Sequence, residues 1–222
     1  MAHIFRMGLG LVIGGWLLAG CGGGSTGPTV KALETVEVRE YQGQNLSSIG
    51  DFQENSIKGP QTVPLDGYQL KITGLADKPL ALTYGQVLAH DHFSKVVTLH
   101  CVEGWDVTIL WEGVLIDDLL KDARARSGAL IAIFHAADGY TSSLTLDFIR
   151  QNKILLAYKM NGVTIPAERG FPFMVVAESK WGYKWVKWVT EIELSDNVNY
   201  QGYWESQGYN NNGDQSGPMF GP

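Results

Sequence analysis

Cys101 is the residue of this 222-residue chain whose type and position most suggest chemistry. The chain has one other cysteine, Cys21, which belongs to a separate N-terminal motif. Without a partner for an intramolecular disulfide, Cys101 is explained by a reactive thiol, an intermolecular bond or a metal ligand. A buried cysteine with no chemical role is the alternative, because free cysteines often pack as small apolar residues. A turn of sequence EGW follows at 103–105, where functional residues are common, and thiolates bind metals strongly. We therefore favour the metal ligand.

The first 21 residues have the pattern of a bacterial lipoprotein signal. Arg6 precedes an apolar run at 9–18, and the run ends in Leu18-Ala19-Gly20-Cys21, which has the form of a lipobox. This pattern predicts that residues 1–20 are a cleaved signal peptide and that Cys21 carries the lipid. The glycine-rich residues 21–30 would then be a flexible tether. We expect a protein of the cell envelope, anchored to a membrane through lipid on its extracytoplasmic side.

Composition limits the classes of partner. The formal net charge is −6, only 18% of residues are charged, and 11% are aromatic. No basic stripe is available to neutralise phosphates, so we expect no nucleic-acid partner. Residues 31–196 are enough for one domain with a sizeable core. Residues 197–222 are rich in Asn and Gly but also contain aromatics, so they form either a disordered tail or a segment that wraps around the domain.

The hydrophobic pattern predicts mostly strands with short helices between them, which is an α+β domain. We expect short helices at 83–88, 115–123 and 145–151, with Thr83 and Thr145 as N-caps. Asn161-Gly162 is a strong hairpin signal. The strands are expected at 68–73, 95–102, 107–113, 131–136, 153–160, 163–165, 171–177 and 185–194.

Three details of these strands matter for the site. In the strand 95–102, alternation places Cys101 on the same face as Val97 and Leu99. Gly113 is expected to end its strand. Lys184 and Lys187 are three residues apart on an extended segment, so they should point to opposite faces, with Lys184 at the surface.

Several blocks occur in an order that resembles the sulfite oxidase-type molybdopterin-binding domain. The resemblance covers residues 52–194 and implies the β-rich α+β fold of that family. The blocks are FQENSIKG at 52–59, HCVEGW at 100–105, WEGV at 111–114, DGYTSSL at 138–144, NG at 161–162, GFP at 170–172 and GYKWVKW at 182–188.

The resemblance implies a cofactor, Mo-molybdopterin, and a set of residues that hold it. Cys101 matches the catalytic thiolate that binds molybdenum. The cofactor-binding positions implied by the matching blocks are Asn55, Ile57, Lys58, His100, Trp185, Val186 and Lys187. A lysine is suited to the pterin phosphate as a point charge. The implied function is a lipid-anchored oxidoreductase that transfers an oxygen atom, with electrons exchanged through a separate protein, because the chain has no haem or iron–sulfur motif.

Three departures from the family pattern bear on substrate and cofactor loading. Met174 stands where the family commonly has an arginine, and His100 stands where methionine sulfoxide reductase-type relatives have one. Fewer fixed cations weaken the attraction for an oxyanion such as sulfite, so the substrate does not follow from the resemblance. Arg6 also stands alone, unlike the twin-arginine leader of folded, cofactor-loaded exported proteins.

Three other interpretations stay open at the level of sequence. The first is a binding or structural module that keeps the fold without the cofactor. The second is a zinc site formed by Cys101 with histidines. The third is an aromatic platform of Trp181, Trp185 and Trp188 for sugars or cationic ligands. The histidines concerned are His90, His92, His100 and His135.

Overall fold

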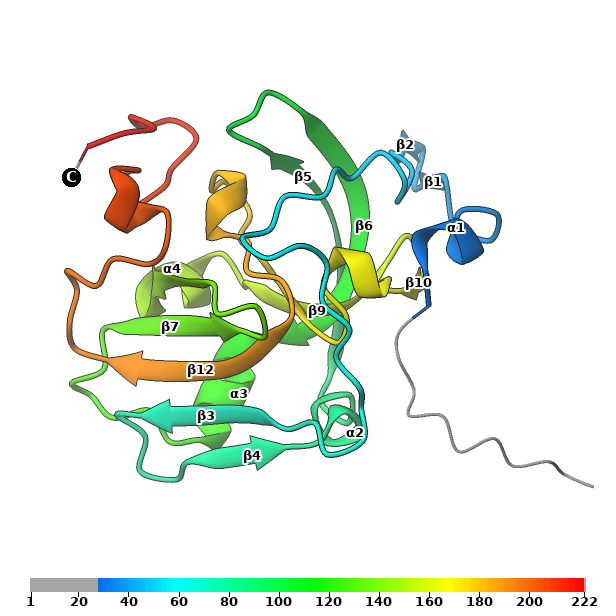
Figure 1. The fold of residues 1–222 in the computed structure, drawn as a ribbon. Coiled ribbons are helices and arrows are strands. Elements are labelled where there is room, and N and C mark those ends of the chain that lie inside the picture. The colour runs from blue at the N-terminus through cyan, green and yellow to red at the C-terminus, as the bar shows by residue number, and fades with distance from the viewer. Residues whose placement is uncertain (1–27, 222) are drawn as a thin grey trace, which may run out of the picture.

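The computed structural model describes residues 28–221, and these residues form two five-stranded sheets around a shared apolar core (Figure 1). The predicted signal peptide and Cys21 lie outside the described residues. No helix within 28–221 has the length and apolar character needed to cross a membrane.

The first sheet carries the Cys101 turn at one end of its long hairpin. Its order is β10-β9-β6-β5, with β11 also paired to β9, and all its pairs are antiparallel. Cys101 follows directly after β5, so the hairpin of β5 and β6 positions it. The strands are β5 (His92–His100), β6 (Asp106–Leu115), β9 (Leu155–Met160), β10 (Val163–Thr164) and β11 (Met174–Val176).

The second sheet has the order β4-β3-β12-β7-β8. β12 pairs in parallel with β3 and antiparallel with β7, so the last strand of the chain lies in the middle of the sheet. The strands are β3 (Leu70–Gly74), β4 (Leu80–Leu82), β7 (Ile131–Ala136), β8 (Thr141–Thr145) and β12 (Val189–Ser195); a separate two-stranded ribbon consists of β1 (Glu40–Tyr41) and β2 (Gln44–Asn45).

Short helices connect the strands, as predicted. The Thr83 side chain accepts from the Gln86 backbone N–H in a capping box, and Thr145 accepts from the Phe148 N–H. The helices are α1 (Val30–Leu33), α2 (Tyr84–Val87), α3 (Ile116–Asp122) and α4 (Leu146–Gln151), and the 3-10 turns are η1 (Ala167–Arg169), η2 (Gly182–Lys184) and η3 (Glu205–Gln207).

Two local predictions on the first sheet had different outcomes. Asn161 and Gly162 both have positive φ, at 48° and 77°, as a tight hairpin between β9 and β10 requires. Gly113, however, does not end its strand, because β6 continues to Leu115. A Cβ at Gly113 would lie 2.4 Å from the Leu156 carbonyl oxygen, so this glycine instead permits close approach of β9 at a register shift.

The apolar core is built by buried side chains from the strands of both sheets, and burying these side chains stabilises the strands. Trp111, Ile72 and Phe134 have essentially no exposed surface. Trp111 is also held by a hydrogen bond from its indole nitrogen to the Val97 carbonyl, at 3.3 Å. Val97, Leu99 and Cys101 are all buried, so the predicted apolar face of β5 is correct.

The C-terminal segment, residues 197–221, packs on the domain, and in Figure 1 it runs from orange to red past the end of β12. Gly202 lies directly against β8, because a Cβ there would be 2.3 Å from the Thr141 carbonyl oxygen. Glu205 is almost fully buried. Residues 197–221 therefore wrap around the domain, and some of their side chains reach its interior.

Candidate active site

One pocket brings the Cys101 turn together with segments from both ends of the domain. The pocket opens to solvent, and it encloses about 820 Å³ when the open space at its mouth is included. Its walls come from residues 52–57, 99–105, 138–140, 182–188 and 204–209, and from Met174.

A tight turn holds Cys101 at the pocket. The Cys101 N–H donates to the Trp105 carbonyl at 2.9 Å, and the Gly104 N–H donates to the Cys101 carbonyl at 3.0 Å. Gly104 has a φ of +86°, which explains why glycine is needed in this turn. Gly182 approaches from η2, and a Cβ at this glycine would lie 3.4 Å from the Cys101 Cα. The thiol is therefore placed by backbone on two sides.

The environment of the Cys101 thiol combines opposing influences. Burial raises the pKa of Cys101, while a hydrogen bond from the Glu103 backbone lowers it. The charge of Glu103 raises it, and a hydrogen bond from the Asn55 side chain and the charge of Lys187 lower it. Asn55 and Lys187 thus act on the sulfur from two distant parts of the chain, and both favour the thiolate form that binds metals.

A cluster of charges lies beside the pocket and consists of two buried cations, Arg169 and Lys187, and the more exposed Glu54. Lys187 Nζ donates to Glu54 Oε2 at 3.1 Å and lies 4.6 Å from the centre of the Trp188 ring. Burial lowers the pKa of Lys187, and Glu54 counteracts this shift by its charge and hydrogen bond. Burial also lowers the pKa of Arg169, with Glu54 again opposing. Arg169 and Lys187 thus place two buried cations beside the pocket, and the acidic groups Glu34, Glu168 and Asp138 also act on their pKa values.

The structure brings together most of the residues that the sequence singled out. Asn55, Ile57, Cys101, Trp185 and Lys187 all line the pocket. They come from three separate parts of the chain, so the fold is what makes them neighbours.

Three of the predicted positions lie outside the pocket lining. His100 does not line the pocket, and its Nδ1 contacts Asp106 Oδ1 at 2.7 Å. Val186 is fully buried, and its carbonyl accepts from the Val175 N–H. Lys58 is exposed, and its Nζ lies 3.2 Å from the position of a Cβ on Gly139, next to the pocket residue Asp138.

The prediction that Lys184 lies at the surface is wrong. Lys184 belongs to η2, not to an extended strand, and its side chain is fully buried. Its Nζ donates to Glu205 Oε1 at 2.7 Å and to the Asn211 carbonyl at 2.9 Å. Lys187 is likewise buried, and it precedes the last strand, because β12 begins only at Val189 and not at Trp185 as expected.

Several residues of the site were missed from the sequence. Arg169 directly precedes the GFP block, whereas a cation was expected only after that block. The aromatic side chains at the pocket had no recognisable spacing, because they come from segments that meet only in the fold. These aromatics are Phe52, Trp105, Tyr140, Tyr183, Trp204 and Tyr209.

The rival sites are not formed. Within residues 28–221, no three His, Cys, Asp or Glu side chains gather as a metal site would require, so the zinc hypothesis is wrong. The three tryptophans do not form an exposed aromatic platform, because Trp185 and Trp188 are almost fully buried and line the pocket. Trp185 packs against Trp111 with ring centres 5.8 Å apart and donates to the Lys180 carbonyl.

The pocket has the features that a metal-bearing pterin with a phosphate requires. It offers one thiol at its wall and a buried lysine beside a second cation. A family model for the oxidoreductase molybdopterin binding domain matches residues 58–204. The chain belongs to this family. It is therefore an oxidoreductase whose cofactor is Mo-molybdopterin, and the resemblance noted in the sequence is confirmed.

Similar proteins agree with the family and the fold. An uncharacterized oxidoreductase of Bacillus subtilis, YuiH, is 34% identical over 66% of this chain and 74% of its own length. The catalytic subunit of the protein-methionine-sulfoxide reductase MsrP of Gluconobacter oxydans is 31% identical over 58% of this chain, but only 47% of its own length is matched. The sulfane dehydrogenase SoxCD of Paracoccus pantotrophus has a similar fold, with a TM-score of 0.63, 20% identity, and coverage of 84% of this chain and 56% of that one. The predicted β-rich fold is confirmed.

Proposed function

We propose that this protein is an oxygen-atom-transferring oxidoreductase that reduces an organic S-oxide at a molybdenum bound by Cys101. The observation that carries the proposal is the meeting of Cys101, Asn55 and Lys187, from three chain segments, in one pocket. The names of relatives, which include protein-methionine-sulfoxide reductases, support the substrate class.

The residues of the chain have distinct roles in this proposal. Bound molybdopterin supplies a metal that takes up or gives two electrons and exchanges an oxygen atom. Cys101 provides the protein's ligand to that metal. Lys187, with Arg169 behind it, holds the pterin phosphate, and Glu54 must give up its contact with Lys187 when the phosphate binds. Asn55 orients the pterin beside the sulfur.

Electrons come from a separate protein. Of the two cysteines of the chain, Cys21 is the proposed lipid site, so too few remain for an iron–sulfur cluster, and the sequence has no haem-attachment motif. The partner is proposed to be membrane-associated, as is expected if the enzyme itself carries a lipid anchor.

The alternative, a module that keeps the fold without its cofactor, has less support. Such a module has no need of a thiol at the pocket and of two buried cations, Arg169 and Lys187, beside it, since buried charges are costly. The lone Arg6 and Met174 were the reasons for considering it.

Metal and pterin analysis of the full-length protein, produced in a cofactor-synthesising host, tests the proposal directly. We expect one molybdenum and one pterin per chain, and oxidation of a reduced viologen dye in the presence of methionine sulfoxide. Fully loaded protein that reduces no S-oxide would refute the proposed reaction. Protein without pterin from the native host would favour the module.

Lys187→Met is expected to weaken retention of the pterin. The substitution keeps the packing of the side-chain stem and removes the charge. Losing a charge-assisted bond to a buried phosphate costs about 1.5–3 kcal/mol, or roughly ten- to a hundredfold in cofactor affinity. Pterin released by denaturation of the purified variant measures the effect.

Lys95→Met is the matched control for this experiment. Lys95 is also a partly buried lysine paired with a carboxylate, Glu178 at 2.9 Å, but it does not line the pocket. Its variant should retain the wild-type pterin content. Equal retention in both variants would show that Lys187 does not hold the phosphate.

The lipid anchor is proposed from the sequence motif around Cys21. Cys21→Ser removes the sulfur to which the lipid attaches, so the variant should move from the membrane fraction to the soluble fraction. Immunoblots of fractionated cells measure this shift. A variant that is still processed and still bound firmly to membranes would contradict the anchor.

A further inference from the structure

The C-terminal segment contributes two aromatic residues to the pocket wall. Trp204 and Tyr209 line the same pocket as Cys101. The family match ends at residue 204, so Tyr209 belongs to a stretch that the family model does not cover. The C-terminal segment therefore takes part in the site together with residues inside the family match.

A buried ion pair joins the C-terminal segment to η2, which lies beside the pocket. Glu205, adjacent to Trp204, pairs with Lys184 of η2, and both side chains are fully buried. Glu205 Oε1 also accepts from the Ser142 hydroxyl at 2.5 Å, so β8 and η2 both hold it. Removal of either charge would leave the other buried without its counter-charge, which makes the attachment of Trp204 strong.

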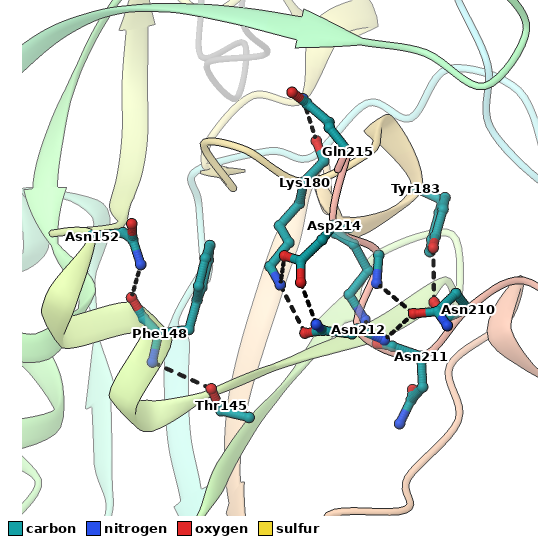
Figure 2. Close-up of polar contacts among 12 residues, drawn as sticks. Thr145, Phe148, Asn152, Lys180, Tyr183, Asn210, Asn211, Asn212, Asp214 and Gln215 are labelled. Atoms are coloured by element: carbon teal, nitrogen blue, oxygen red, sulfur yellow. Dashed lines mark hydrogen bonds and ion pairs between the residues drawn. The ribbon is translucent and has the colours of Figure 1, made fainter. Parts of the chain in front are cut away.

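A second set of contacts fastens the chain after Tyr209, as Figure 2 shows. The Tyr183 hydroxyl donates to the Asn210 carbonyl at 2.7 Å. Lys180, which lies 4.2 Å from the Phe148 ring, donates to both Asp214 and Asn212. These contacts fix residues 210–214 against the segment that leads into η2, so Tyr209 is held from both sides.

Aromatic contacts join the two residues into one surface. Trp204 and Tyr209 meet edge to face with ring centres 5.7 Å apart, and Tyr209 lies 5.1 Å from Tyr183. Tyr183 itself lines the pocket. Rigid aromatic walls of this kind contact apolar groups over a large area and recognise them by shape.

The charges of the pocket favour an uncharged substrate. Its charged lining residues within the described chain are Glu103, Asp138 and Lys187, and Lys187 is the residue proposed to hold the pterin phosphate. The two carboxylates that are left, Glu103 and Asp138, repel an oxyanion substrate. An uncharged S-oxide meets no such penalty.

We infer that Trp204 and Tyr209 select the substrate by contacting the apolar organic group of a neutral S-oxide. This inference rests on the proposed function. In the reaction the S–O bond breaks, two electrons from the electron-transfer partner and two protons are consumed, and the thioether and one water leave. The aromatic wall takes no part in these bond changes and acts on the organic group alone.

Steady-state kinetics with two sulfoxides tests the inference in the cofactor-loaded, full-length enzyme. Methyl phenyl sulfoxide presents a large apolar group and dimethyl sulfoxide presents almost none. We expect Trp204→Ala and Tyr209→Ala to lower kcat/KM about tenfold or more for methyl phenyl sulfoxide and less than about threefold for dimethyl sulfoxide. Trp204→Phe keeps an aromatic ring and should therefore retain most of the wild-type kcat/KM for methyl phenyl sulfoxide. In the wild type, a carboxylate on the phenyl ring should lower kcat/KM about tenfold or more.

Binding measured by calorimetry separates this inference from the proposed reaction. The dissociation constant of methyl phenyl sulfoxide should rise about tenfold in Trp204→Ala, whether or not the enzyme turns over. Val198→Ala, at an exposed position of the same segment outside this pocket, should match the wild type. Equal losses for both sulfoxides together with unchanged binding would overturn the selecting role. A wild type that binds but reduces neither sulfoxide would instead refute the proposed reaction.

Discussion

Replacing Cys101 with serine is expected to abolish turnover while the protein stays folded. Serine is close in size to cysteine, but its hydroxyl does not ionise to give the anionic ligand that a thiolate provides. Because Cys101 is buried, the new hydroxyl should cost about 1–2 kcal/mol of stability. The visible absorption from thiolate-to-metal charge transfer should disappear together with activity, and both are measured on purified, cofactor-loaded protein.

Val97→Ala is the control for the structural cost of the Cys101 variant. Val97 lies on the same face of β5 and is equally buried, but it lies outside the pocket lining. Its truncation should cost about 2 kcal/mol by leaving a cavity, and activity should persist. A Cys101→Ser enzyme that still turns over at a rate similar to Val97→Ala would exclude Cys101 as the metal ligand.

Lys184→Met should produce the largest loss of stability. The substitution leaves Glu205 buried without its counter-charge, and breaking one partner of a buried ion pair costs about 3–5 kcal/mol. Urea unfolding followed by fluorescence measures the free energy of unfolding. Burial lowers the pKa of Lys184 and Glu205 raises it, which shows that the pair and not solvent stabilises this charge.

Two further variants identify the origin of that loss. Lys159→Met breaks a half-exposed pair with Glu112 and should cost no more than about 1 kcal/mol. Combining Lys184→Met with Glu205→Leu should recover much of the stability, since no buried charge is then left alone. A double variant as unstable as the sum of the single variants would show that the two residues do not act as a pair.

The parts of the fold with local causes could be predicted from the sequence. The capped helices after Thr83 and Thr145 and the Asn161-Gly162 hairpin each depend on a few neighbouring residues. The burial of Cys101 followed from strand alternation. In each case short-range stereochemistry and the three-dimensional fold favour the same structure.

The parts of the site with distant causes could not be predicted in this way. Lys184 was expected at the surface because strand periodicity was applied to η2, and its partner Glu205 lies on a segment that composition left undecided. The contact between Glu54 and Lys187 joins residues that are 133 positions apart. Pairing over such separations leaves no periodic signal, and only the assembled sheets determine it.

The distribution of the pocket walls along the chain has a consequence for biosynthesis. Residues 52–57 form one wall and residues 204–209 another, so the pocket needs almost the whole polypeptide. While a ribosome still holds the C-terminal residues, Lys184 lacks Glu205 and the wall near η2 is missing. Cofactor insertion should therefore follow release from the ribosome, and a product truncated before residue 200 should neither close the pocket nor retain the pterin.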